Sequence, residues 1–207
     1  MLMPPWLRRF TFTAHVTTSV GWLGAIAAYL APAVAGLASE DTAVVRASYI
    51  AMGLIIRFVV LPFSIAALAT GLAQSLATEW GLFRHYWIAT KFVLTVAATV
   101  VLLLHIRTVN FVSQFASGST FSVAELGLAR AQLVLHAVGG LVVLLVATTL
   151  SVYKPWGRTP YGLRVRDDVA AVAVRPVALR RYFLVVLVAL AVIVAALHIA
   201  GGGLPHH

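Results

Sequence analysis

The sequence predicts an all-α membrane protein: a polytopic transmembrane helix bundle, with a four-helix core and a fifth, C-terminal helix. Hydrophobic residues make up 61% of the 207 positions, only 10% are charged, and the mean hydropathy is +0.98. A soluble domain of this length cannot bury so much apolar surface, so we expect lipid to be the surrounding solvent. The apolar residues form five runs, each long enough to cross about 30 Å of hydrocarbon at about 1.5 Å per residue.

The five predicted spans cover residues 11–37, 49–76, 87–109, 130–152 and 182–200. The first of them is nearer in length to a full span than to the hydrophobic region of a signal peptide. We therefore expect a retained first helix and not a cleaved leader.

Polar residues indicate where some of these helices begin. Residues 39–42 can cap an amphipathic lead-in to the second helix. Ser122 and Glu125 have the spacing of a capping box, which predicts that the fourth helix begins near Val123. Pro62 has no backbone N–H, so it should kink the second helix.

The placement of the basic residues predicts the orientation in the membrane. The chain has 15 Lys and Arg against six acidic residues, a formal net charge of +9. One set of loops and ends carries ten of them: Arg8, Arg9, Arg84, Lys154, Arg158, Arg164, Arg166, Arg175, Arg180 and Arg181. The opposite set carries Arg46, Arg107 and Arg130. The positive-inside rule therefore places the N-terminus in the cytoplasm and the C-terminus outside, in a bacterial cytoplasmic membrane.

The same charge pattern argues for a lipid bilayer as the partner of the basic residues, and against nucleic acid. We expect the basic cytoplasmic loop to lie on the anionic membrane surface, with a cytoplasmic protein as the alternative partner. The predicted divisions are a core at 1–154, this loop at 155–181, the fifth helix at 182–201 and a tail at 202–207.

Ionisable residues inside the predicted spans are candidates for function, because they are costly in hydrocarbon. They are Arg57, Lys91, His15, His105, His136 and His198. No acidic residue falls within a span, which counts against a carboxylate proton relay, a sodium site or a di-iron centre. The absence of cysteine excludes disulfides, thiolate-bound metals, iron–sulfur clusters and covalently attached haem.

Helical spacing sorts these residues by face and depth. On the third helix Lys91 and His105 share one stripe, and on the first helix a stripe runs from His15 through Trp22 to Tyr29. Such stripes face the bundle interior, so we expect an internal site. His105 lies toward the outer side of the membrane, whereas His15 and Lys91 lie toward the inner side.

Two histidines on neighbouring helices match the needs of a b-type haem, namely imidazole ligands, cations for the propionates and small residues that give room. His105 and His136 are the candidate axial pair. Gly139 and Gly140 would give room, and Arg57, at a similar depth, would meet a propionate.

A second candidate haem ligand is His15, with Lys91 as a propionate partner or sixth ligand. The alternative is structural, since membrane histidines often only hydrogen-bond a neighbouring helix, and Gly-Gly pairs often only allow close packing.

Three short elements carry a family resemblance: His15 followed by Trp22 and Gly24; Pro62 followed by Gly71; and Trp87 four residues before Lys91, with His105 further along. With them the first four helices, roughly three quarters of the chain, resemble a superfamily of small bacterial membrane proteins. It includes the haem-dependent protoporphyrinogen oxidase HemJ and the copper-resistance protein CopD, and the chain looks most like a group of predicted four-helix integral membrane proteins within it.

The resemblance to HemJ implies a haem b, with His15 as a ligand and Lys91 as a functionally needed residue. The chain departs from the HemJ pattern at Ala89, which stands where that segment has a second histidine. His105 also lies about one helical turn further along than the HemJ histidine.

The leading hypothesis is therefore a membrane haem b protein, with His105, His136 and His15 as candidate ligands. It would transfer electrons or support a haem-dependent oxidoreductase, with a membrane redox partner or quinone, and could form a homo-oligomer. One alternative is a protein that handles copper or a small solute, although copper usually prefers Cys and Met. Another is a non-catalytic accessory subunit of a membrane complex.

Overall fold

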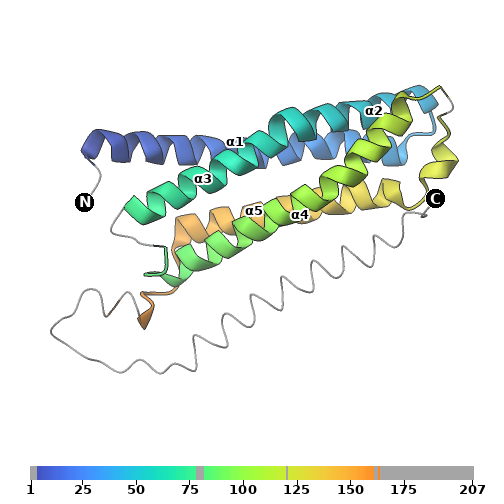
Figure 1. Ribbon diagram of the computed structural model, residues 1–207. Coiled ribbons are helices and arrows are strands. Elements are labelled where there is room, and N and C mark those ends of the chain that lie inside the picture. The colour runs from blue at the N-terminus through green and yellow to red at the C-terminus, as the bar shows by residue number, and fades with distance from the viewer. Residues whose placement is uncertain (1–3, 78–81, 120, 161–162, 164–207) are drawn as a thin grey trace.

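The computed structural model describes residues 4–77, 82–119, 121–160 and 163, and within these ranges it is an all-α bundle without a β-strand (Figure 1). Its elements are α1 (Pro5–Ala38), α2 (Thr42–Ile55), the π-helical turn η1 (Ile56–Val60), α3 (Leu61–Ala77), α4 (Tyr86–Ser117), the 3-10 helix η2 (Val123–Leu126) and α5 (Ala129–Tyr153). The segments α2, η1 and α3 follow one another without a break and form one long return helix. The predicted all-α class is confirmed.

Four stretches of the described chain are long and apolar enough to cross a membrane: Pro5–Ala38, Thr42–Leu76, Tyr86–Ser117 and Ala129–Tyr153. They correspond to the first four predicted spans. The predicted fifth span at 182–200 lies outside the described residues, as does most of the loop predicted at 155–181.

The second span begins earlier than its apolar core, as the capping residues predict. The Asp41 side chain accepts a hydrogen bond of 2.8 Å from the Ala43 N–H, and α2 starts at Thr42. This bond satisfies one of the N–H groups that have no partner within a first helical turn.

Replacing Asp41 with alanine should lower the free energy of unfolding by about 1 kcal/mol, the usual cost of losing an N-cap. Titration of the purified protein with sodium dodecyl sulfate, followed by circular dichroism, measures this loss. Glu40→Ala is the matched control, since the Glu40 carboxylate is next to Asp41 but does not cap the helix. Equal losses in the two variants would contradict the capping role.

A helical turn begins at Val123 as predicted, but the predicted capping box at Ser122 is wrong. The Ser122 side chain makes no capping hydrogen bond, and only the short η2 follows it. Gly127 then has φ +42° and ψ −126°, a backbone conformation that cannot continue a right-handed helix. Helix α5 therefore starts at Ala129, after the break.

Pro62 disturbs the second span through the π-helical turn that precedes it. Pro62 cannot donate to the carbonyl four residues before it, and its ring needs space on that side. The wider turn of η1, which includes Arg57, lies directly before Leu61 and Pro62. Single π turns of this kind commonly interrupt α-helices.

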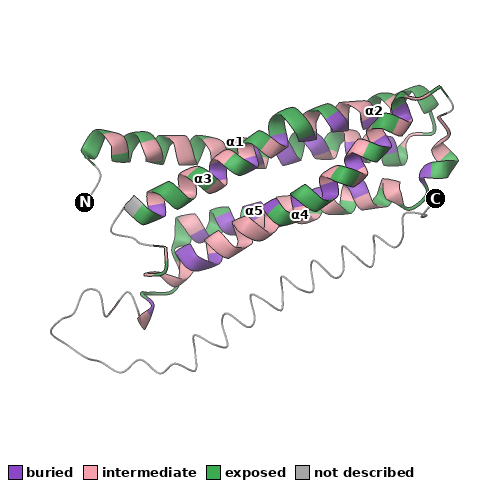
Figure 2. Ribbon diagram, viewed as in Figure 1, coloured by how far each residue is buried: buried purple, intermediate pink, exposed green. Residues whose placement is uncertain are grey.

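The helices pack most tightly in the half of the bundle that contains the C-terminal half of α1 (Figure 2). Tyr29, Tyr49 and Met52 are almost completely buried there. By contrast, no described residue of α1 before Trp22 is buried, and Trp6 is 69% exposed. Large apolar side chains also cover the outside of the bundle, as expected where lipid surrounds it.

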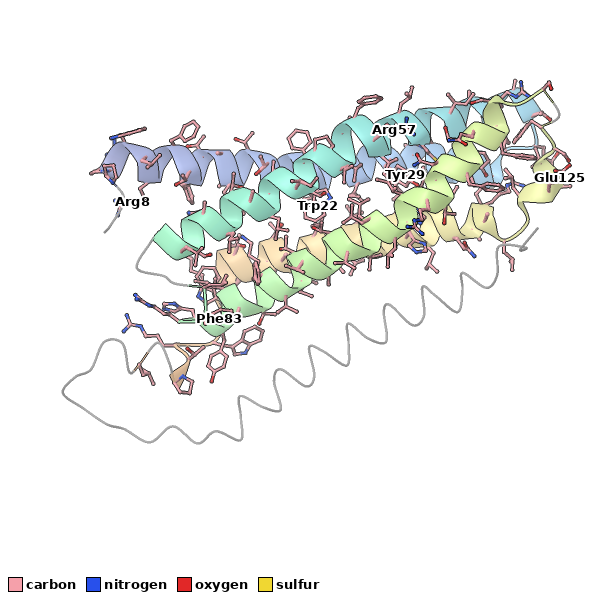
Figure 3. The ribbon with its side chains drawn as sticks, viewed as in Figure 1. Arg8, Trp22, Tyr29, Arg57, Phe83 and Glu125 are labelled. Atoms are coloured by element: carbon pink, nitrogen blue, oxygen red, sulfur yellow. The ribbon has the colours of Figure 1, made fainter. Side chains whose placement is uncertain are left out.

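The antiparallel arrangement brings the basic helix ends to one end of the bundle. Arg8 and Phe83 lie at one end of the bundle and Glu125 at the other (Figure 3). At the Phe83 end, the Thr159 N–H donates to the Arg84 carbonyl at 2.9 Å. The chain after α5 thus starts by packing against the turn before α4, on the side predicted to be cytoplasmic.

Candidate functional site

Three helices bring polar side chains together toward the N-terminal end of α1. The His15 ring from α1 lies between Thr70 of α3 and Lys91 of α4, and all three side chains are half-buried. His15 Nδ1 is 3.2 Å from Thr70 Oγ1, and His15 Nε2 is 3.2 Å from Lys91 Nζ. We call these residues the inner cluster.

The hydrogen bonds of the inner cluster determine which ring nitrogen of His15 carries the proton. The Thr70 hydroxyl donates to the Ala66 carbonyl at 2.6 Å, so its oxygen is left to accept from His15 Nδ1–H. The neutral ring then has its lone pair on Nε2, the nitrogen that faces Lys91. A histidine that binds a metal is oriented in the same way, with one N–H donated to a neighbour and the other nitrogen free.

Gly71 makes the position of His15 possible. A Cβ atom added at Gly71 would lie 2.9 Å from His15 Cε1, which is closer than such atoms approach. Three residues from separate elements of the family resemblance, His15, Gly71 and Lys91, are thus brought together by the fold. Gly24 is different, because it is exposed and a Cβ added there would meet nothing within 4 Å.

A second polar group, the outer cluster, consists of Tyr29, His105 and His136. The rings of His105 and His136 stack face to face, with centroids 4.0 Å apart and planes at 9°. The Tyr29 hydroxyl is 3.5 Å from His105 Nε2, which is a long and weak hydrogen bond. His136 Nδ1–H donates to the Gln132 carbonyl at 2.8 Å.

The geometry of the outer cluster disagrees with the predicted axial pair. Two axial ligands point their nitrogens at the metal from opposite faces of the macrocycle, so the macrocycle lies between the rings. His105 and His136 instead contact each other through their ring faces, so their ring nitrogens do not point at each other. We therefore do not retain His105 and His136 as the ligand pair.

A cavity adjoins the outer cluster in the centre of the bundle. It has about 740 Å³ of empty space, a value that includes the space at its open side. Trp22 and Tyr29 of α1 line it, together with both histidines. Gly139 and Gly140 also line it, so the predicted room beside His136 is present.

Arg57 lies away from both histidine groups. Its guanidinium donates to Asn110 Oδ1 at 3.0 Å, and the side chain is exposed on the side where α2 and α4 meet. It does not line the central cavity, so the structure does not support its predicted contact with a propionate there. The remaining candidate, His198, lies outside the described residues.

No family model, curated protein or solved structure matches this chain. Within the described ranges, no three His, Cys, Asp or Glu side chains come together as a group that could hold a metal ion.

Sequence reasoning predicted His15 and Lys91 as neighbours at one depth, but it missed Thr70. The signal was available, because Thr70 directly precedes Gly71, a residue of the family resemblance. The close pairing of Tyr29 with His105 was also missed, since Tyr29 was recognised only as part of an inward-facing stripe.

Proposed function

We propose that this chain is a membrane haem b protein in which His15 and Lys91 would hold the iron. The observation that carries the proposal is the contact between His15 Nε2 and Lys91 Nζ, two nitrogens from different helices that face each other at 3.2 Å. A neutral imidazole and a neutral amine each offer one lone pair to iron. The family resemblance supports the same two residues.

The donor set fits a six-coordinate iron. A bond from imidazole nitrogen to a first-row metal is about 2 Å, so two axial nitrogens on one metal lie about 4 Å apart. The observed 3.2 Å is shorter by less than 1 Å. Haem binding would replace this hydrogen bond, and α1 and α4 would have to move apart to admit the macrocycle.

The surroundings also fit a large, flat and doubly anionic group. The part of α1 that carries His15 has no buried residue among those described, so this part of the helix is accessible from outside the bundle. Arg8 and Arg9 lie seven and six residues before His15, about 9–10 Å along the helix axis. These guanidinium groups would hold the propionates near the membrane surface.

In this arrangement the protein binds and orients the cofactor, which when bound supplies one-electron redox chemistry. Thr70 fixes the tautomer of His15, and Gly71 leaves space for its ring. With its N-terminus in the cytoplasm of a bacterium, as the charge pattern favours, the site would lie near the cytoplasmic face. A membrane redox partner would then exchange electrons with it there.

The proposal is tested by the absorption spectrum of the protein purified from cells supplied with a haem precursor. We expect a Soret band and a reduced-minus-oxidised difference spectrum of the b type, with one haem per chain by pyridine haemochrome assay. Protein that purifies folded and without a Soret band under these conditions would exclude the proposal.

Replacing Thr70 with valine should weaken haem binding about 10-fold or more, the usual cost of removing the partner that orients a metal-binding histidine. Thr70→Ser keeps the hydroxyl and should bind haem like the wild type. Titration of haem into the apoprotein, followed at the Soret band, measures both affinities. Equal affinities for the two variants would show that Thr70 does not position His15.

A further inference from the structure

We propose that the central cavity between α1, η1, α4 and α5 is a binding site for a membrane quinone, separate from the inner cluster. Three observations indicate the class of ligand. They are the residue types that line the cavity, the hydrogen-bond donors of Trp22 and Tyr29 at different positions along α1, and the side on which the cavity opens. The inference does not depend on haem binding at His15.

The first observation is a buried donor without a partner. Trp22 is only 3% exposed and lines the cavity, yet its Nε1–H finds no hydrogen-bond partner among the described residues. A buried N–H group left without an acceptor costs about 1–3 kcal/mol. An oxygen atom of a ligand in the cavity would remove that cost.

The second observation is the Tyr29 hydroxyl of the outer cluster. Tyr29 lies seven residues after Trp22 on α1. Trp22 and Tyr29 share one face of α1 and are separated by about 10 Å along its axis. Both project from α1 toward α4 and α5 (Figure 3). Among the described residues, the Tyr29 hydroxyl has only the weak contact with His105 at 3.5 Å, so it can still donate to another oxygen.

The charge of the lining residues restricts the ligand to a neutral molecule. None of the side chains that line the cavity is Lys, Arg, Asp or Glu, and most are aliphatic. A phosphate headgroup or a haem propionate would have no cation to meet there. A para-quinone, by contrast, is a flat neutral ring with one carbonyl oxygen at each end, and each oxygen can accept one hydrogen bond.

The opening of the cavity fits a ligand that arrives from lipid. The lining residues from α1 and η1 are all buried, whereas the half-buried ones, such as Val101, Gly140 and Val143, all come from α4 and α5. Leu104 and Val142 are exposed on the outer faces of these two helices. A prenyl tail would leave the cavity between α4 and α5 and remain in hydrocarbon.

The test is isothermal titration of the purified protein in detergent micelles with ubiquinone-1, a benzoquinone carrying one isoprene unit, with empty micelles as the blank. We expect saturable binding of one molecule per chain. Trp22→Phe removes the N–H and should weaken binding about 3- to 10-fold, the usual effect of losing one neutral hydrogen bond.

Two glycines offer a matched pair of variants. A Cβ atom at either Gly139 or Gly24 meets nothing within 4 Å, but only Gly139 lines the cavity, whereas Gly24 is exposed. Gly139→Leu should abolish saturable binding and Gly24→Leu should leave it unchanged. His15→Ala, which removes the proposed haem ligand, should bind ubiquinone-1 like the wild type.

The inference is overturned if the wild type takes up ubiquinone-1 only as empty micelles do, or if Gly139→Leu binds it like the wild type. It is also overturned if Gly139→Leu loses the Soret band, because the cavity would then hold haem. If Gly139→Leu does not fold, Trp22→Phe decides, and an unchanged affinity in that variant contradicts the site.

Discussion

Replacing His15 with alanine is expected to abolish the Soret band of the purified protein. The His15 ring offers Nε2 toward the centre of the inner cluster, and the described residues near it provide only Lys91 as a second nitrogen ligand. Without the imidazole, a bound haem would lose one of the two residues proposed to hold its iron. Absorption spectra of protein prepared with excess haem measure the loss, and added imidazole should restore part of the band.

Variants of Lys91 separate a ligand from a simple hydrogen-bond partner. Lys91→Arg keeps a cation that can donate to His15 Nε2, but a guanidinium has no lone pair for iron. We therefore expect Lys91→Arg to change the ferric spectrum as strongly as Lys91→Leu does.

The control for His15 is His136→Ala. His136 stacks on His105 and cannot face it across a macrocycle, so this variant should keep a normal Soret band. A band that is lost in His136→Ala and kept in His15→Ala would reverse the assignment and restore the outer pair as ligands.

Replacing Arg130 with methionine is expected to cause the largest loss of stability among single changes at the end of the bundle where α1 ends. Its guanidinium donates to the carbonyls of Gly36 at 2.8 Å and Leu37 at 2.9 Å, and to the Tyr49 hydroxyl at 3.2 Å. These carbonyls belong to the last turn of α1, where the helix itself supplies no N–H partner. Loss of these charged hydrogen bonds should lower the free energy of unfolding by about 2–3 kcal/mol.

Unfolding by sodium dodecyl sulfate measures this effect, with Arg107→Met as the matched control. Arg107 is exposed on α4, so its replacement should change stability little. The Soret band of folded Arg130→Met should remain, because Arg130 and the inner cluster lie toward opposite ends of α1. A stability equal to that of Arg107→Met would show that Arg130 does not hold the end of α1.

The four described spans could be predicted from the sequence because hydrocarbon imposes a minimum length on an apolar run, and each run meets it. Helical spacing also predicted which faces point to the interior of the bundle, because polar residues such as Lys91, Thr99 and His105 avoid lipid. The capping box failed because Ser122 and Glu125 fit the pattern, but Gly127 breaks the helix two residues later.

The candidate site was harder to predict, because depth along a helix does not determine the orientation of a ring. His105 and His136 do lie at one level, as expected, yet they stack face to face and are not opposed. His15 and Lys91 also lie at one level, and there the rotation of the helices points the two nitrogens at each other. That rotation depends on the packing of all four spans, including the π turn before Pro62.

The most direct test of the account is the near-infrared magnetic circular dichroism of the ferric protein. The position of the charge-transfer band depends on the pair of axial ligands, and it separates imidazole with amine from two imidazoles. We predict the imidazole–amine position in the wild type and its loss in Lys91→Arg. A band at the bis-imidazole position, unchanged in Lys91→Arg, would contradict the assignment of His15 and Lys91.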